Sequence, residues 1–253
     1  MIVKRDCVYT PKGKNRPLHI YLPDDYATSL DRYPVLYMFD GHNLFSDEDA
    51  TYGKSWGLKE FLDKWDRKLI LVGIECGHEG DERLSEYLPY RALPPARFSM
   101  FLPRGRATMD WIVNEVKPMI DRDYRTLPDR EFTGIGGSSM GGIMALFAGV
   151  RYNHVFSKAA CVSSAIGFCP TAVLKDVMET NVDPDTRVYL SWGEKERHMK
   201  DGADMSRLWN ETVAARLREQ GAEAVTLCQK GGGHCEADWE KQVPGFMDFL
   251  WMR

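Results

Sequence analysis

The sequence predicts a single α/β domain with a mostly parallel central sheet of about eight strands, helices on both faces and an antiparallel hairpin at the N-terminus. Short apolar runs typical of buried strands alternate with segments of helical spacing along most of the chain. The 253 residues, of which 43% are hydrophobic, suffice for one sizeable core. No repeat, low-complexity tract or linker interrupts residues 1–253, so we expect one domain.

The first half of the chain begins with a hairpin signal and continues with buried strands. The expected strands, of which the first two form the hairpin, are Cys7–Thr10, Leu18–Leu22, Val35–Phe39 and Leu69–Ile74. Helical spacing predicts helices over Trp56–Trp65 and Thr108–Ile120. Pro118 should bend the second helix near its end. Between them, residues 75–103 are irregular and rich in proline, as expected of an active-site rim loop.

The second half repeats the alternation of strand and helix. Its expected strands are Phe132–Gly136, Ala159–Val162, Arg187–Trp192 and Val225–Gln229. Its expected helices follow Ser139 or cover Thr171–Met178, residues 201–219 and Trp239–Trp251. Strands that alternate with helices in this way favour parallel pairing, with crossovers on both faces of the sheet.

Charge and hydropathy exclude several classes of function. The net charge is −4 and no basic run stands out, so we expect no nucleic-acid partner. The first residues lack the apolar stretch of a signal peptide, and no segment has the roughly 20 apolar residues of a membrane span. We therefore expect a cytoplasmic protein without a membrane partner. The oligomeric state cannot be inferred from these features.

The chain has six cysteines, none of them in a C-x-x-C pair. Cys161 and Cys228 stand in apolar runs, and we expect both to be buried as small hydrophobic side chains. A reducing compartment makes disulfides unexpected. Because the spacings match no common zinc pattern, we expect no metal, and the chemistry considered below needs no cofactor.

The five residues Gly137–Gly141 fit the pattern G-x-S-x-G, with Ser139 at its centre. In this pattern a serine occupies a sharp turn between a strand and a helix, with its hydroxyl exposed as a nucleophile. The glycines let the two elements pass each other without Cβ clashes. Glycine-rich turns of this kind also bind phosphate, so the motif alone leaves both interpretations open.

Residues that follow other predicted strands supply the partners of a serine nucleophile. His234 follows three glycines after the last strand and is the candidate base. Glu196 is the candidate acid, with Glu194 as its alternative and Asp201 or Asp204 as further possibilities. The chain order serine, acid, histidine is that of one class of hydrolases. Backbone N–H groups of Met140 and His42 are candidates for the oxyanion hole.

With these residues in view, the chain resembles the putative esterase family of the α/β-hydrolase superfamily, which includes feruloyl esterase domains, enterochelin-type siderophore esterases, S-formylglutathione hydrolases and mycolyltransferases. The segments that carry the resemblance are Val35–Phe45, Arg83–Pro89, Gly136–Gly142 and Gly231–His234. The resemblance implies an α/β-hydrolase fold and places the acid at Glu196, three residues after Gly193. Feruloyl relatives commonly carry Asp there; the longer Glu side chain must approach His234 from a slightly different backbone position.

We therefore expect a serine carboxylesterase that acts through an acyl-enzyme on short-chain or aryl esters of carbohydrates. The expected binding partner is its substrate, a small-molecule or oligosaccharide ester. Alternatives are an acyltransferase with the same triad, a siderophore-type or S-formylglutathione thioester hydrolase, and a non-catalytic binding protein. Candidate substrate-binding residues are Gly41, Trp56, Glu86 and Tyr87, with Tyr90 and Phe98 as further candidates for the pocket wall.

Overall fold

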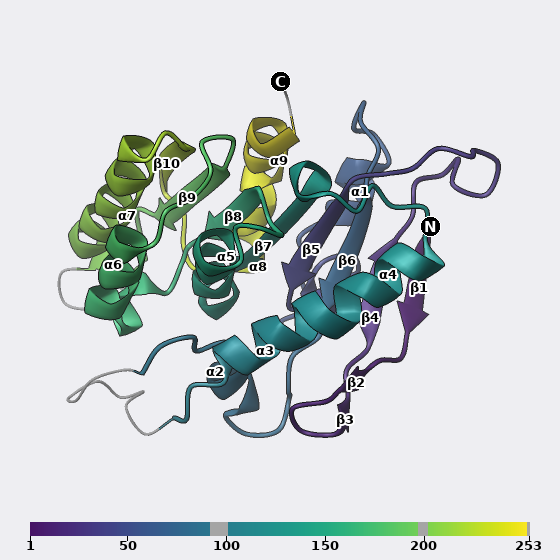
Figure 1. Ribbon diagram of the computed structural model, residues 1–253, viewed down its shortest axis with the longest axis horizontal. Coiled ribbons are helices and arrows are strands. Elements are labelled where there is room, and N and C mark those ends of the chain that lie inside the picture. The colour runs from purple at the N-terminus through teal and green to yellow at the C-terminus, as the bar shows by residue number, and fades with distance from the viewer. Residues whose placement is uncertain (92–100, 197–201, 252–253) are drawn as a thin grey trace.

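The centre of the fold is an eight-stranded sheet (Figure 1). The computed structural model describes residues 1–91, 101–196 and 202–251. The strands, in their order across the sheet, are β1 (Ile2–Arg5), β4 (Leu18–Tyr21), β6 (Ile70–Ile74), β5 (Val35–Phe39), β7 (Thr133–Ser138), β8 (Lys158–Val162), β9 (Arg187–Gly193) and β10 (Glu223–Gln229). From β6 to β10 every pairing is parallel, whereas β4 is antiparallel to both of its neighbours. The predicted α/β-hydrolase fold with a mostly parallel sheet is confirmed.

The N-terminal hairpin exists, but its predicted bounds are wrong. In the sheet, β4 pairs with β1 (Ile2–Arg5) and not with Cys7–Thr10. The short strands β2 (Val8–Tyr9) and β3 (Lys14–Asn15) form the tip of the hairpin as a separate two-stranded ribbon. Pro17 lies between the two ladders and has no amide hydrogen to donate, so the pairing is interrupted there.

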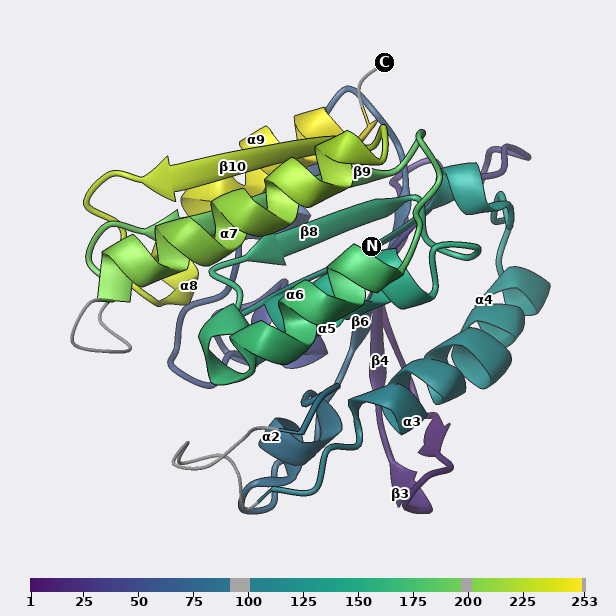
Figure 2. The ribbon, with the colours of Figure 1, turned by 60° about the vertical axis from the view of Figure 1, so that its left-hand side comes forward.

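Helices cover both faces of the sheet, as expected. The α-helices are α1 (Leu58–Leu62), α2 (Glu82–Glu86), α3 (Gly105–Trp111), α4 (Lys117–Asp123), α5 (Met140–Arg151), α6 (Pro170–Glu179), α7 (Gly202–Glu219), α8 (Glu236–Trp239) and α9 (Val243–Trp251). Tyr37 and Phe39 of β5 point into the core under α3 to α7, whereas Leu36 and Met38 point into the core under α1, α8 and α9. Figure 2, seen from the side of α6 and α7, shows α9 behind β10.

The helix around Pro118 differs from its prediction. It continues to Asp123, and its irregular part is a π-helical turn at Ile112–Val116 that joins α3 to α4. Pro118 lies in the first turn of α4 and has no N–H for the carbonyl four residues earlier. The chain accommodates this missing hydrogen bond in the preceding π-turn.

Two further expectations are tested by the fold. The rim segment of residues 75–103 is not wholly irregular, because it contains α2. Cys161 is buried as expected, but Cys228 is exposed, so that prediction is wrong. Cys228 lies on β10, the edge strand of the sheet, whose residues are only partly covered.

Among the described residues, no helix combines the length and the apolar character that a bilayer crossing requires.

Candidate active site

Ser139 stands at the turn between β7 and α5. Its φ of +56° and ψ of −118° are a strained backbone conformation for a residue with a side chain. The neighbouring glycines permit the turn: a Cβ on Gly137 would lie 2.9 Å from the backbone of Gly141, and one on Gly141 would lie 3.0 Å from Phe39 Cβ. The pattern G-x-S-x-G thus has the strand-turn-helix context in which a serine hydroxyl is exposed for attack.

His234 follows β10 on a loop that is tied to the end of β9. Lys195 N donates to Gly232 O at 2.8 Å, and Gly231 N donates to Glu194 Oε2 at 2.7 Å. Gly231 has a φ of +67°, which a glycine adopts without steric cost. These contacts bring His234 to the carboxyl ends of the parallel strands, where Ser139 also lies.

The two candidate acids have different partners. Glu196 is buried, and its Oε2 lies 3.5 Å from His234 Nδ1. Glu194 is exposed and accepts the hydrogen bond from Gly231 N. Asp204 is exposed on α7, and Asp201 lies outside the described residues. The structure therefore brings Glu196, and not Glu194, to the imidazole.

A chain of buried hydrogen bonds holds Glu196 in place. Ser163 Oγ donates to Glu196 Oε1 at 2.5 Å, and Trp239 Nε1 donates to Ser163 Oγ at 2.9 Å. The Trp239 ring also lies edge-on to His234, with 5.0 Å between the ring centroids. Ser163 has a φ of +46° and follows β8. Sequence reasoning did not single out Ser163, although its position after a buried strand was an available signal.

The candidate oxyanion donors come from two elements. Met140 is the first residue of α5, so its N–H belongs to the first turn, which has no intrahelical acceptor. His42 lies in the short 3₁₀ turn Gly41–Asn43 that follows β5. Both turns lie at the carboxyl ends of adjacent parallel strands, β5 and β7.

An ion pair between the buried Asp40 and the half-buried Arg83 supports the Gly41–Asn43 turn. Arg83 donates from Nε and Nη2 to the two oxygens of Asp40, both at 2.7 Å, and Asp40 N donates to Tyr87 Oη at 3.2 Å. Burial alone would raise the pKa of the Asp40 carboxyl, but the charge of Arg83 and its hydrogen bonds hold that pKa below its usual value. Asp40 itself has a φ of +59°, so this contact fixes a strained residue.

Arg83→Met should destabilise the fold by about 3 kcal/mol at neutral pH, because it leaves the Asp40 carboxylate buried without its partner. The pKa of Asp40 is lowered in the folded protein. Its contribution to the free energy of unfolding is therefore present above the ordinary Asp pKa and is lost as pH falls through the folded value. Urea unfolding of the wild type and of Arg83→Met at pH 7 and pH 3 measures the destabilisation and its dependence on pH. Asp40→Asn combined with Arg83→Met should recover part of the loss, and an unchanged midpoint in the single variant would contradict this account.

Ser139 and His234 line two cavities. One is mostly apolar, and its other lining residues are Ser164, Ala165, Gly167, Phe168, Glu196, Met205, Ser206 and Trp209. The other is polar, and its lining includes Asp40, His42, Asn43, Thr51, His78, Arg83 and Glu236. In the polar cavity, burial raises the pKa of the Glu236 carboxyl, and Asn43 Nδ2 donates to Glu236 Oε1 at 3.3 Å. Ser139 thus lies between an apolar and a polar environment.

Residues 11–249 match the protein family described as "Putative esterase". The chain belongs to this family. The esterase is 27% identical over 246 residues to the protein YbbA of Bacillus subtilis (strain 168), covering 95% of this chain and 94% of that one. Its fold is similar to that of a ferulic acid esterase (TM-score 0.74, 17% identity, 99% and 97% of the two chains). An IroE-like serine hydrolase from Shewanella oneidensis is also similar (TM-score 0.77, 21% identity, 99% and 79%). The protein is accordingly a carboxylesterase-type hydrolase.

The four candidate substrate-binding residues of the esterase do not line either cavity at Ser139. Gly41 packs against the backbone of Gly73, where an added Cβ would lie 2.7 Å from the carbonyl. Trp56 is buried against Trp239 and Phe246. The remaining two support the fold near the site: Glu86 accepts from Arg16 Nη2 at 2.5 Å, and Tyr87 contacts Asp40.

Two further pocket candidates have other placements. Tyr90 packs edge-on against Phe147 and donates its hydroxyl hydrogen to Asp176 Oδ2 at 2.6 Å. Phe98 lies outside the described residues. The cavity walls instead include Phe168, Trp209 and Glu236, which the sequence pattern did not mark because they come from separate helices and turns.

Proposed function

We propose that the esterase hydrolyses short-chain or aryl carboxylic esters of carbohydrates through a triad of Ser139, His234 and Glu196. The observation that carries the proposal is the placement of Ser139 on a strained turn in the same two cavities as His234, whose Nδ1 lies 3.5 Å from the buried Glu196 carboxylate. With Nδ1 facing Glu196, Nε2 is the ring nitrogen that would take the proton of the serine hydroxyl.

The proposed reaction has two acyl-transfer steps. His234 takes the proton from the Ser139 hydroxyl as its oxygen attacks the ester carbonyl. The N–H groups of Met140 and His42 stabilise the oxyanion that develops. His234 then protonates the departing alkoxide and leaves an acyl-Ser139 intermediate. Water, deprotonated by His234, repeats the sequence and releases the carboxylic acid. Glu196 stabilises the imidazolium that forms in both steps.

The two cavities support an assignment of the two halves of the ester. The apolar cavity, with Phe168 and Trp209, suits a short acyl chain or an aryl group. The polar cavity, with Asn43, Arg83 and Glu236, offers hydrogen-bond partners to a polyhydroxylated alcohol. The fold shared with a ferulic acid esterase agrees with an aryl acyl group.

A panel of acetylated and feruloylated oligosaccharides, compared with the matching esters of simple alcohols, tests the substrate class. The proposal expects a higher kcat/KM for the carbohydrate esters, and equal or lower values would contradict it. Addition of sugar alcohols as acceptors, followed by product analysis, separates hydrolysis from acyl transfer. The same panel should include a siderophore trilactone and S-formylglutathione, whose preferential cleavage would favour those alternatives.

Trp209→Ala should shift the acyl preference toward longer chains. The Trp209 ring lies against Gly167, where an added Cβ would be 2.5 Å from ring atom Cζ3, so the ring closes one wall of the apolar cavity. Its removal should raise the ratio of kcat/KM for butyryl over acetyl p-nitrophenyl esters by about tenfold. Trp65→Ala, which changes a tryptophan that lines neither cavity at Ser139, is the matched control. An unchanged ratio in Trp209→Ala would exclude Trp209 as the limit on acyl length.

A further inference from the structure

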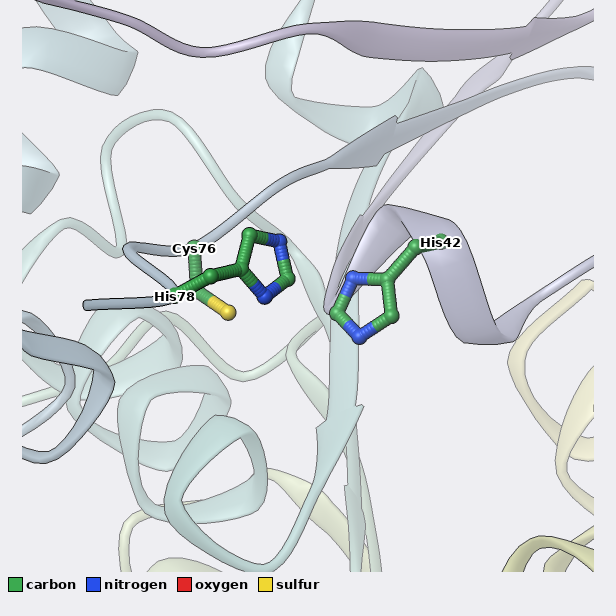
Figure 3. A group of neighbouring side chains, drawn as sticks. All are labelled: His42, Cys76 and His78. Atoms are coloured by element: carbon green, nitrogen blue, oxygen red, sulfur yellow. The ribbon is translucent and has the colours of Figure 1, made fainter. Parts of the chain in front are cut away.

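Three side chains with metal-binding atoms gather on the wall of the polar cavity: His42, Cys76 and His78 (Figure 3). One ligand atom from each lies within 4.8 Å of the other two. His42 comes from the turn after β5, whereas Cys76 and His78 follow β6. Because β5 and β6 are parallel neighbours, their carboxyl ends bring these two segments together.

The His42 side chain is oriented as a ligand and has an unused ring nitrogen. It is 8% exposed, and its Nε2 lies 2.9 Å from Thr51 Oγ1. With the hydrogen on Nε2 donated to Thr51, Nδ1 presents its lone pair. This Nδ1 is buried and has no hydrogen-bond partner, since the nearby Glu75 oxygen, at 3.5 Å, is not in hydrogen-bond geometry. Buried polar atoms without a partner are rare and mark places where a ligand can bind.

Negative charge is available beside the cluster. The Glu75 carboxylate lies 3.3 Å from His78 Nε2, 3.5 Å from His42 Nδ1 and 3.4 Å from His19 Nε2. Together with a Cys76 thiolate, this carboxylate would balance the two charges of a divalent cation. One sulfur and two imidazole nitrogens form a donor set that is typical of zinc.

We propose that His42, Cys76 and His78 bind a zinc-class divalent cation, with Glu75 balancing its charge. Binding forms one metal–sulfur and two metal–nitrogen bonds, releases the Cys76 thiol proton to solvent and changes no oxidation state. Tetrahedral coordination brings ligand atoms to roughly 3.5 Å from one another, so the cluster must contract by about 1 Å. The His78 ring packs edge-on against the His42 ring, with 4.8 Å between the centroids, but its side chain is 55% exposed, so solvent on its outer side leaves room for this movement.

The site faces the cavity that contains Ser139. All three ligands line that cavity, so a fourth position on the ion is accessible to water or to an oxygen of the alcohol part of a substrate. The proposed triad of Ser139, His234 and Glu196 includes none of the three ligands of this ion. The cation instead adds a binding position and holds the turn at His42.

The test uses the full chain, stripped with a chelator and titrated with Zn²⁺ in competition with a chromophoric chelator. One ion should bind per chain, and Co²⁺ should give a thiolate-to-cobalt charge-transfer band. Cys76→Ser should abolish that band and weaken Zn²⁺ binding by at least about tenfold, and His78→Ala should weaken it similarly. Because His78 is largely exposed, His78→Ala keeps the test valid if Cys76→Ser fails to fold.

Cys228→Ser and His154→Ala, which change exposed residues outside the cluster, are the matched controls and should bind like the wild type. The proposal is overturned if no ion binds, if Cys76→Ser or His78→Ala binds like the wild type while folded, or if the controls lose binding equally. Ser139→Ala should retain Zn²⁺ binding. Failure of the metal site is thereby distinguished from failure of the proposed esterase mechanism.

Discussion

Ser139→Ala should reduce kcat for p-nitrophenyl acetate by at least about 10⁴-fold. The substitution removes the only atom that forms the acyl bond in the proposed mechanism, and neither the oxyanion donors nor His234 can replace it. Burst kinetics in the wild type, with an acyl adduct mapped to Ser139 by mass spectrometry, would show the intermediate directly. A fluorophosphonate probe should label the same residue.

The control for this variant is a measurement of its unfolding midpoint. Alanine has to adopt the same φ of +56°, so the strain of the turn remains and the unfolding midpoint should stay close to that of the wild type. Ser138→Ala, one residue earlier, should retain most of the activity. If Ser139→Ala keeps wild-type turnover, Ser139 is not the nucleophile. If activity and stability fall together, the loss of activity reflects unfolding of the variant. Labelling of wild-type Ser139 by the fluorophosphonate probe then decides whether Ser139 is the nucleophile.

Glu196→Gln should reduce kcat by about 10²- to 10⁴-fold, whereas Glu194→Gln should change it by no more than a few-fold. The Glu196 carboxylate is buried 3.5 Å from His234 Nδ1, and a neutral amide cannot stabilise the imidazolium that forms there. Glu194 is exposed and accepts a hydrogen bond from the Gly231 amide, and the side-chain oxygen of Gln can still accept that bond, so the loop that carries His234 should keep its position.

The pair of variants is a matched comparison, because both remove one charge from the same turn. Steady-state kinetics on one ester measures both. A larger loss in Glu194→Gln would reassign the acid, and near wild-type activity in both would remove the acid from the mechanism. Glu196→Asp should retain more activity than Glu196→Gln, since it keeps the charge but shortens the reach to His234 by one methylene.

Patterns within single segments of the sequence were sufficient to predict most strands of the sheet. Continuous apolar runs such as Val35–Phe39 became buried strands with the predicted bounds, because a strand covered on both faces needs apolar side chains at every position. The N-terminal hairpin was less predictable. Ile2–Arg5 carries two charged residues and has no strong strand pattern, and only its pairing with Leu18–Tyr21 makes it a strand.

The proposed nucleophile and base are residues that their local sequence marks. Ser139 and His234 stand among glycines because the backbone there adopts unusual conformations or passes close to other backbone atoms. Glycines at such positions can be recognised in the sequence. Substrate contacts have no such local signature. Trp56 and Glu86 resembled pocket residues by type, yet both lie in the core, where an aromatic ring or a paired carboxylate is equally stable.

The fold class, the strained turn of Ser139 and the glycine-supported loop of His234 could all be predicted from the sequence, because each depends on residues close together in the chain. The partners of these residues depend on how the separate strands are arranged in the folded protein. The contact of Glu196 with His234, the support from Ser163 and Trp239, and the meeting of His42 with Cys76 and His78 all join separate strand ends. Such contacts depend on the order and register of parallel strands, which the pattern of a single segment does not encode.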